Sequence, residues 1–212
     1  MDKKVIMLHV RGYTVDPEIE KEKTKVRMPA VREIYAYFGI DFREIDAWNN
    51  GLTTISVFDA VNKARIAVEK AKIENPDAVI VLSGHSLGEV ALIVASLVVI
   101  DYLIIEDAAL GGVYDFVLRF KKFDLKNEAV ITGLRKNSPG VKLVKKILSG
   151  DYTWPITLEV RSGFAILGQL LFGSFPCTGF GEVLELSNAN HSQVWEHPNV
   201  IGLIAKFVLD RN

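Results

Sequence analysis

The sequence has little of what several common classes of protein depend on. Its 212 residues include one cysteine, Cys177, so no disulfide can form within the chain. The four histidines are scattered and, with this cysteine, show none of the spacings typical of a metal site. The pair Gly111-Gly112 is too short for a glycine-rich phosphate loop. We therefore expect neither a metal nor an organic cofactor.

A large excess of charge is missing too, and so are long apolar runs. The chain has 25 Lys and Arg against 26 Asp and Glu, which gives neither a nucleic-acid footprint nor a polybasic membrane surface. The run at 5–8 meets His9 and Arg11, which makes it too short for a signal-peptide core. Asp101 splits the most apolar region, 90–105, below the length of a bilayer span. We expect a cytoplasmic protein without a nucleic-acid or membrane partner.

The chain does have enough apolar residues, 49%, for a large core, and its length fits a single domain over 1–212. Short apolar or alternating runs predict strands, and three- and four-residue apolar spacing predicts helices between them. This alternation predicts a three-layer α/β/α sandwich on a mostly parallel sheet of about six strands. The strands are expected at 5–10, 42–47, 79–82, 102–105, 156–160 and 182–186.

The helices of this arrangement are expected at 16–38, 56–73, 89–99 and 200–209. Residues 111–151 follow a different pattern: two short helical pieces, 114–120 and 141–148, are joined by basic, turn-rich sequence. We interpret 111–151 as a small helical cap, or lid, inserted over the sheet. Residues 164–172 are apolar without a period that assigns them to a helix or a strand.

The pentapeptide Gly84-His85-Ser86-Leu87-Gly88 follows a buried-strand pattern and precedes an apolar helix pattern. This order predicts a strand, a sharp turn and a helix, with the Ser86 hydroxyl lifted clear at the apex. Gly84 and Gly88 stand where a Cβ would collide across so tight a turn. The alternative is an ordinary glycine-rich turn that carries an incidental serine.

With this motif, the sequence resembles the α/β-hydrolase superfamily, and more closely its small lipase and esterase members. The resemblance covers most of the chain outside 111–151. It includes the serine turn, a first strand that ends in a glycine turn, and His191 in a loop before the closing helix. It implies the chain order serine, acid, histidine that this superfamily uses.

The resemblance implies that Ser86 is the nucleophile and that His191 takes its proton. For the acid we choose Asp107, in the context Ile105-Glu106-Asp107-Ala108-Ala109. The usual position in the superfamily, here within 159–164, has no carboxylate in the loop itself. A competing interpretation is that Asp107 only caps the helical segment after it. The remaining candidates for the acid are Glu106, Glu159 and Glu182.

The resemblance also implies an oxyanion hole made of two backbone N–H groups. One belongs to Leu87, the residue after the nucleophile, and the other to Tyr13 (or Gly12) after the first strand. Arg11 replaces a histidine that the superfamily often has there. It could contact an acidic substrate, or it could simply be solvated.

The other histidines have no assigned role in the reaction. We expect His85 to pack beside the site and His197 to be a surface residue at a helix start. The same reasoning places Cys177 in a loop with no role as a nucleophile.

The function that follows is a serine hydrolase that cleaves a small-molecule carboxylic ester through an acyl-enzyme. Two alternatives remain. Glu89 directly after Gly88 is similar to the signature of malonyl-CoA:acyl-carrier-protein acyltransferases. The fold could also be a binding module that has lost catalysis.

Overall fold

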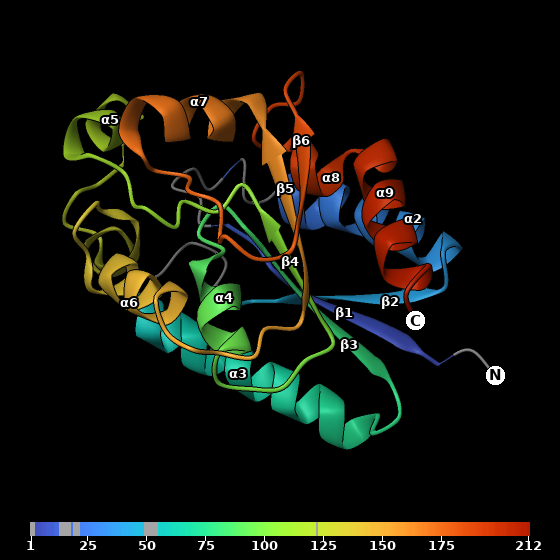
Figure 1. Cartoon of the computed structure of the whole chain (residues 1–212). Helices are drawn as coiled ribbons and strands as arrows, with labels where there is room; N and C mark the ends of the chain where they lie inside the picture. The colour runs from blue at the N-terminus through green and yellow to red at the C-terminus, as the bar shows by residue number, and fades with distance from the viewer. Residues whose placement is uncertain (1–2, 13–17, 19–21, 49–54, 122) are drawn as a thin grey trace.

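Six parallel strands form the centre of the computed structural model, which describes residues 3–12, 18, 22–48, 55–121 and 123–212. Within these residues the strand order is β2-β1-β3-β4-β5-β6, and every neighbouring pair is parallel. The strands are β1 (Val5–Val10), β2 (Ile40–Ile45), β3 (Val79–His85), β4 (Tyr102–Glu106), β5 (Ile156–Ser162) and β6 (Glu182–Leu186). The predicted parallel sheet is confirmed (Figure 1).

Helices cover both faces of this sheet, so the predicted three layers are confirmed as well. In Figure 1, α3 (Val57–Glu74), α4 (Glu89–Ala95) and α6 (Pro139–Leu148) lie on one face. The other face carries α2 (Met28–Tyr37), α8 (Gln193–Glu196) and α9 (Pro198–Leu209). The remaining helices, α5 (Asp115–Phe120) and α7 (Gly163–Phe172), lie beyond the carboxyl ends of the strands.

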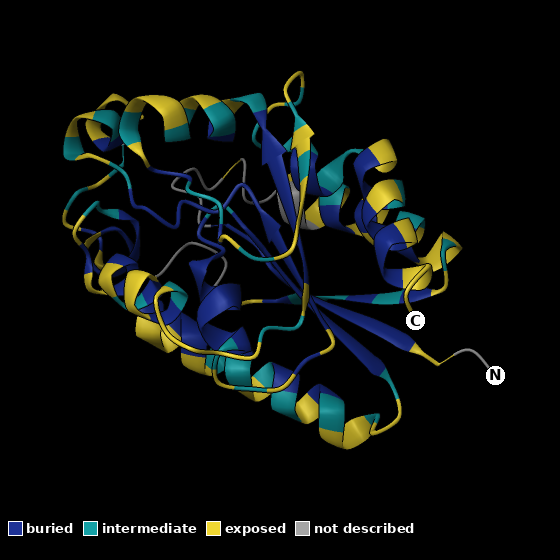
Figure 2. Cartoon of the chain, in the orientation of Figure 1, coloured by how far each residue is buried: buried dark blue, intermediate teal, exposed yellow. Residues whose placement is uncertain are grey.

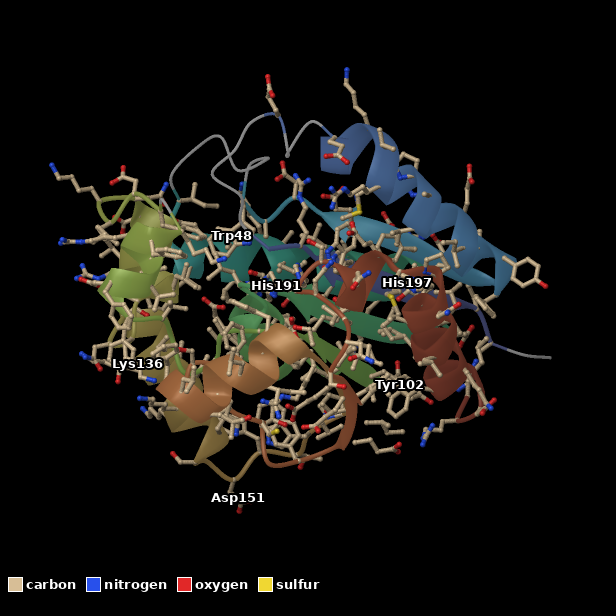
Figure 3. The ribbon with its side chains drawn as sticks, turned by 90° about the horizontal axis from the view of Figure 1, so that it is seen from above. Trp48, Tyr102, Lys136, Asp151, His191 and His197 are labelled. Carbon is tan, nitrogen blue, oxygen red and sulfur yellow. The ribbon has the colours of Figure 1, made fainter. Side chains whose placement is uncertain are left out.

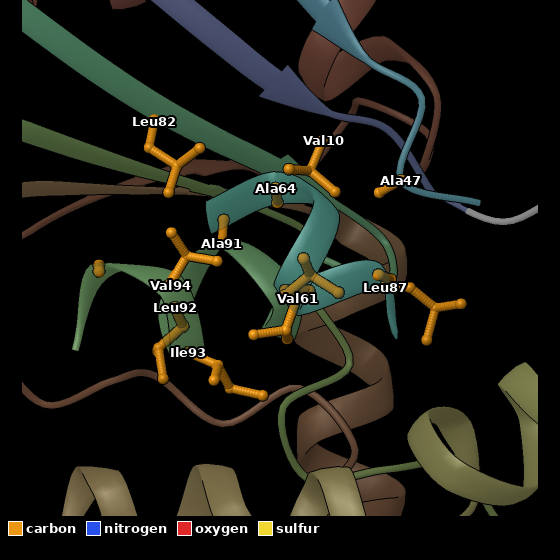
Figure 4. Packing of buried hydrophobic residues seen from close by; sticks show 14 of the residues in the cluster. Val10, Ala47, Val61, Ala64, Leu82, Leu87, Ala91, Leu92, Ile93 and Val94 are labelled. Atoms are coloured by element: carbon orange, nitrogen blue, oxygen red, sulfur yellow. The ribbon is translucent and has the colours of Figure 1, made fainter. Parts of the chain in front are cut away.

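The side chains of each central strand alternate between two separate cores. Ile6 and Leu8 belong to the core under α3 and α4, whereas Val5 and Met7 belong to the core under α2 and α9. This is the pattern of a strand covered on both faces. Figure 2 shows these strands buried, and Figure 4 shows Leu82 packing against helix side chains such as Ala64 and Val94.

Local capping signals explain where the helices begin and end. Ser56 and Asp59 form a capping box at the start of α3, with each side chain accepting from the backbone N–H of the other residue. The chain leaves α2 through Gly39, whose φ of 75° favours glycine. The helix predicted at 16–38 is seen as a π-helix, η1 (Lys23–Arg27), followed by α2, since Pro29 supplies no N–H there. Residues 13–17 and 19–21 lie outside the described part.

Some elements differ from the sequence prediction. The apolar stretch 164–172, which the sequence did not assign, is the helix α7; its start is capped by Ser162, and it ends at Gly173 with a φ of 57°. The short helix α8 and the π-helix η3 (Val130–Leu134) were not predicted. Strand β2 begins two residues earlier than expected, because Ile40 already pairs with Val5.

The stretch 111–151 contributes to two parts of the molecule. Its α5 lies near the carboxyl ends of the strands, whereas α6 packs against α4 in the helical layer. That the whole stretch acts as a cap stays a prediction. None of the helices in the described ranges combines the length and the apolar character that crossing a membrane requires.

Candidate active site

Ser86 occupies the turn between β3 and α4 in a strained backbone conformation. Its φ is 62°, which is uncommon for a residue with a side chain. The Ser86 N–H donates to the carbonyl of Glu106 at 3.0 Å, and its carbonyl accepts from the Ala109 N–H at 2.9 Å. Both backbone groups are thus held by the end of β4 and the residues after it, which keeps the serine at the apex.

The glycines around Ser86 are required by close backbone approach. A Cβ on Gly88 would lie 2.4 Å from the Gly84 carbonyl oxygen, and one on Gly84 would lie 2.7 Å from the Ala91 Cβ. The collision predicted from the sequence is therefore confirmed. Gly12, after β1, approaches as closely: a Cβ there would lie 2.5 Å from the Ser86 Cβ. The first loop therefore passes directly beside the serine.

Asp107 and His191 form a pair at the carboxyl edge of the sheet. The His191 Nδ1 lies 3.0 Å from the Asp107 Oδ2. The Asp107 side chain is fully buried, whereas a third of the His191 side chain is exposed. Because an ionised carboxylate can only accept, the hydrogen bond places the imidazole proton on Nδ1 and leaves Nε2 as the free lone pair.

Ser162, at the end of β5, holds the Asp107 carboxylate from the other side. Its N–H donates to Oδ1 at 2.7 Å, and its hydroxyl donates to Oδ2. Ser162 was not predicted as a site residue from the sequence, although it lies where the superfamily usually has its acid. Asp107 itself has a φ of 47° and caps no helix, because the next helix, α5, begins at Asp115. The interpretation of Asp107 as a helix cap is therefore wrong.

The other candidate acids do not approach His191. Glu159 accepts from the N–H and hydroxyl of Thr178, and Glu182 pairs with Arg211 at 2.6 Å. Glu106 points to the face of the sheet that α2 and α9 cover, where its Oε2 lies 3.5 Å from the His9 Nδ1. Burial raises the pKa of Glu106 well above its usual range, and the neighbouring Asp107 carboxylate raises it further. Of these carboxylates, Asp107 alone is bonded to the imidazole.

Aromatic side chains surround His191. The ring of His85 lies 4.5 Å from that of His191, and its Nε2 donates to the His191 carbonyl at 2.7 Å. The ring of Phe164, on α7, lies 5.4 Å away on another side. The expectation that His85 packs beside the site is confirmed. His197 lies away from His191, at the start of α9 (Figure 3).

Ser86 and His191 line one cavity of about 390 Å³, which is within the range of small-molecule sites. Its other walls are mainly apolar and come from α5, α7 and the neighbouring loops. These other lining residues are Ala109, Val113, Val117, Leu118, Lys121, Phe123, Leu134, Phe164, Phe175 and Asn190. Among the described residues no hydrogen bond joins the Ser86 hydroxyl to the imidazole. The two groups thus share a cavity without a hydrogen bond between them in this structure.

Of the two residues predicted to supply the N–H groups of the oxyanion hole, Leu87 is among the described residues and Tyr13 is not. The Leu87 N–H has no acceptor within the described ranges, so it is available to a bound oxyanion. Tyr13 lies outside the described residues. Arg11, just before Gly12, is buried and pairs with Glu44 at 2.6 Å. The alternative of a solvated Arg11 is therefore wrong, and the charge of this guanidinium is balanced within the protein.

Glu89, the first residue of α4, is a buried acid, and its burial was not predicted from the sequence. Its side chain lies against η3, where a Cβ on Gly133 would come within 2.8 Å of the Oε1. Neither carboxyl oxygen has a hydrogen-bond partner among the described residues. Burial without a partner raises the pKa of Glu89 to about 8. The side chain is therefore neutral over most of the physiological range.

This shift predicts that stability falls as pH rises. The pKa of Glu89 is about 8 in the folded state and 4.5 ordinarily, so folding favours the protonated carboxyl. The resulting contribution to the free energy of unfolding is complete below pH 4.5 and is lost as pH rises to 8. At 1.36 kcal/mol per pKa unit, the loss is at most about 5 kcal/mol. Glu89→Gln should make the free energy of unfolding depend less on pH between pH 4.5 and pH 8. Urea unfolding at pH 5 and pH 9 measures the effect, with Glu33→Gln, an exposed position of α2, as the control. A curve for Glu89→Gln parallel to that of the wild type would contradict it.

The described ranges contain no group of three or more His, Cys, Asp or Glu side chains that could hold a metal ion. Cys177 lacks the lowered thiol pKa that an activated nucleophile has. Burial raises the pKa of its thiol, and the nearby Glu159 carboxylate adds to the effect.

This chain is similar to several known proteins in structure. No family model matches the sequence, and no curated protein matches it. The solved structure of Est1E from Butyrivibrio proteoclasticus has a TM-score of 0.64 at 18% identity and covers 98% of this chain and 88% of its own. Dienelactone hydrolase from Anabaena variabilis has a TM-score of 0.56 at 12% identity, and the match covers 98% of this chain and 85% of the hydrolase. MenH from S. aureus has a TM-score of 0.55 at 10% identity, covering 99% and 95%.

Proposed function

We propose that this chain, which has the α/β-hydrolase fold, is a serine hydrolase that cleaves a carboxylic ester through an acyl-enzyme. The observation that carries the proposal is the Asp107–His191 pair, which reaches the cavity that Ser86 also lines. The structural neighbours support a hydrolase, since two of them are an esterase-type protein, Est1E, and a dienelactone hydrolase.

In the proposed reaction, the Ser86 Oγ attacks the carbonyl carbon while the His191 Nε2 takes its proton. Asp107 holds the imidazole in the required tautomer and stabilises the imidazolium that forms. The N–H of Leu87 and an N–H of the loop after β1 stabilise the oxyanion. The imidazolium then protonates the departing alcohol. Water, deprotonated by His191, attacks the acyl-serine and regenerates the free enzyme.

The cavity supports an ester with an apolar acyl group of modest size. Most of the lining is apolar, and Phe123, Phe164 and Phe175 are aromatic. A second structure of Est1E was solved with ferulic acid bound, so an aromatic acyl group is a reasonable member of a substrate panel.

A panel of p-nitrophenyl esters tests the proposal. From acetate to butyrate we expect kcat/KM to rise by about fourfold per methylene, because each buried CH₂ contributes about 0.8 kcal/mol. A pre-steady-state burst of nitrophenol should accompany turnover, and a fluorophosphonate probe should label the protein covalently. A feruloyl ester is run alongside.

The burst, the covalent labelling and a transfer assay with an acyl-carrier protein separate the alternatives. A protein that gives neither a burst nor covalent labelling would be a binding module, and the proposal would fail. Transfer of the acyl group to an acyl-carrier protein in preference to water would instead favour the acyltransferase.

A further inference from the structure

One cation, Lys121, contributes to the wall of the cavity that contains Ser86 and His191. It follows α5 directly, and all but a few of the other lining residues are apolar. No carboxylate lines this cavity within the described part of the chain. Lys121 is itself solvent-exposed, so its attraction for an anionic group beside the apolar wall is that of a surface charge and is screened by salt.

No carboxylate in the described part of the chain balances the charge of Lys121. Its Nζ lies 5.8 Å from the centroid of the Phe164 ring, and it forms no ion pair with any carboxylate in the described ranges. Other cations nearby are already paired. Arg135 bonds to Asp115 at 2.8 Å, and the buried Arg161 lies 3.4 Å from Glu185. Among the described residues that line the cavity, Lys121 is the Lys or Arg side chain available to a ligand.

The same aromatic ring links Lys121 to the reacting groups. Phe164 lies 5.4 Å from the His191 imidazole and 5.8 Å from the Lys121 ammonium, measured from its ring centroid. The ammonium is thus no farther from the imidazole than these two distances together. A substrate of modest size can place its ester at Ser86 and a second polar group at Lys121.

We propose that Lys121 is a specificity-determining residue that selects esters carrying a carboxylate. The inference rests on the proposed hydrolase function and names the substrate class of that site. The carboxylate can belong to the acyl part, as in the half-ester of a dicarboxylic acid, or to the alcohol part, as in an ester of hydroxybenzoate. Both place an anion near the ammonium.

Three substrates distinguish these possibilities: p-nitrophenyl butyrate is neutral, p-nitrophenyl hemiglutarate has an anionic acyl group, and butyryl 4-hydroxybenzoate has an anionic leaving group. For Lys121→Gln we expect kcat/KM of at least one anionic ester to fall by about fivefold more than that of the neutral ester, as for an exposed ion pair of about 1 kcal/mol. Lys121→Arg should retain most of the preference. The preference of the wild type should decrease with added salt.

The control is Lys126→Gln, which removes an exposed lysine of the same connection outside the cavity and should leave all three rates unchanged. Equal loss on all three esters with Lys121→Gln, or no loss on any, would overturn the inference while leaving hydrolysis intact. A wild type that cleaves none of the three would overturn the proposed function and this inference together.

Discussion

Ser86→Ala is expected to lower kcat/KM for p-nitrophenyl butyrate by about 10⁴-fold to 10⁶-fold, as for removal of the nucleophile in other serine hydrolases. The change removes one oxygen atom from a cavity wall and leaves the backbone bonds to Glu106 and Ala109 in place. Covalent labelling by fluorophosphonate should disappear with the activity. Initial rates and mass spectrometry of the labelled protein measure both effects.

The control for this variant is Ser149→Ala, in an exposed position after α6 and remote from the cavity. It should retain wild-type activity and labelling. Thermal unfolding of Ser86→Ala should stay close to that of the wild type, because the variant buries no new polar group. Undiminished turnover in Ser86→Ala would show that the nucleophile is another residue.

Asp107→Asn is expected to lower kcat by about 10⁴-fold, because an amide at this position favours the wrong tautomer of His191. The carboxylate oxygen that accepts from Nδ1 can be replaced by an NH₂ group, which donates. The proton then moves to Nε2, and the imidazole can no longer take the Ser86 proton. The φ of 47° at residue 107 is tolerated by asparagine, so backbone strain does not confuse the result.

Glu106→Gln is the matched control for the Asp107 variant. Both residues are buried at the end of β4, but Glu106 points to the opposite core, and its pKa is raised by burial. Glutamine resembles the protonated acid, so we expect less than about a tenfold loss of activity. A larger loss in Glu106→Gln than in Asp107→Asn would transfer the role of the acid to Glu106. Steady-state kinetics at pH 7, with circular dichroism to check folding, decide between them.

Local sequence predicted much of the fold because the signals that form strands and helices lie within a few neighbouring residues. The alternation at Glu182–Leu186 predicted β6 with the observed limits. The serine pentapeptide likewise predicted the strand, turn and helix around Ser86. By contrast, α7 could not be assigned, since nearly every position is apolar and a helical period cannot be seen without polar residues.

The residues of the candidate site could likewise be predicted from the sequence only in part. Ser86 could be found because its turn requires glycines at fixed positions, and Asp107 was chosen with three other carboxylates still open. Its contact with His191 and with Ser162 depends on strand order. Because β4 pairs with β5 in the register Glu106 to Val160, residues 55 positions apart in sequence come together at the sheet edge.

By itself, then, the sequence determined the parallel sheet, its helical layers and the serine at the apex of a tight turn, since each follows from hydrophobic period, capping and glycine placement nearby in the chain. Only the tertiary structure decided which acid meets His191, that Glu89 is buried without a partner, and that Lys121 lines the cavity. The physical reason is that burial, pairing and charge balance are set by side chains from distant segments.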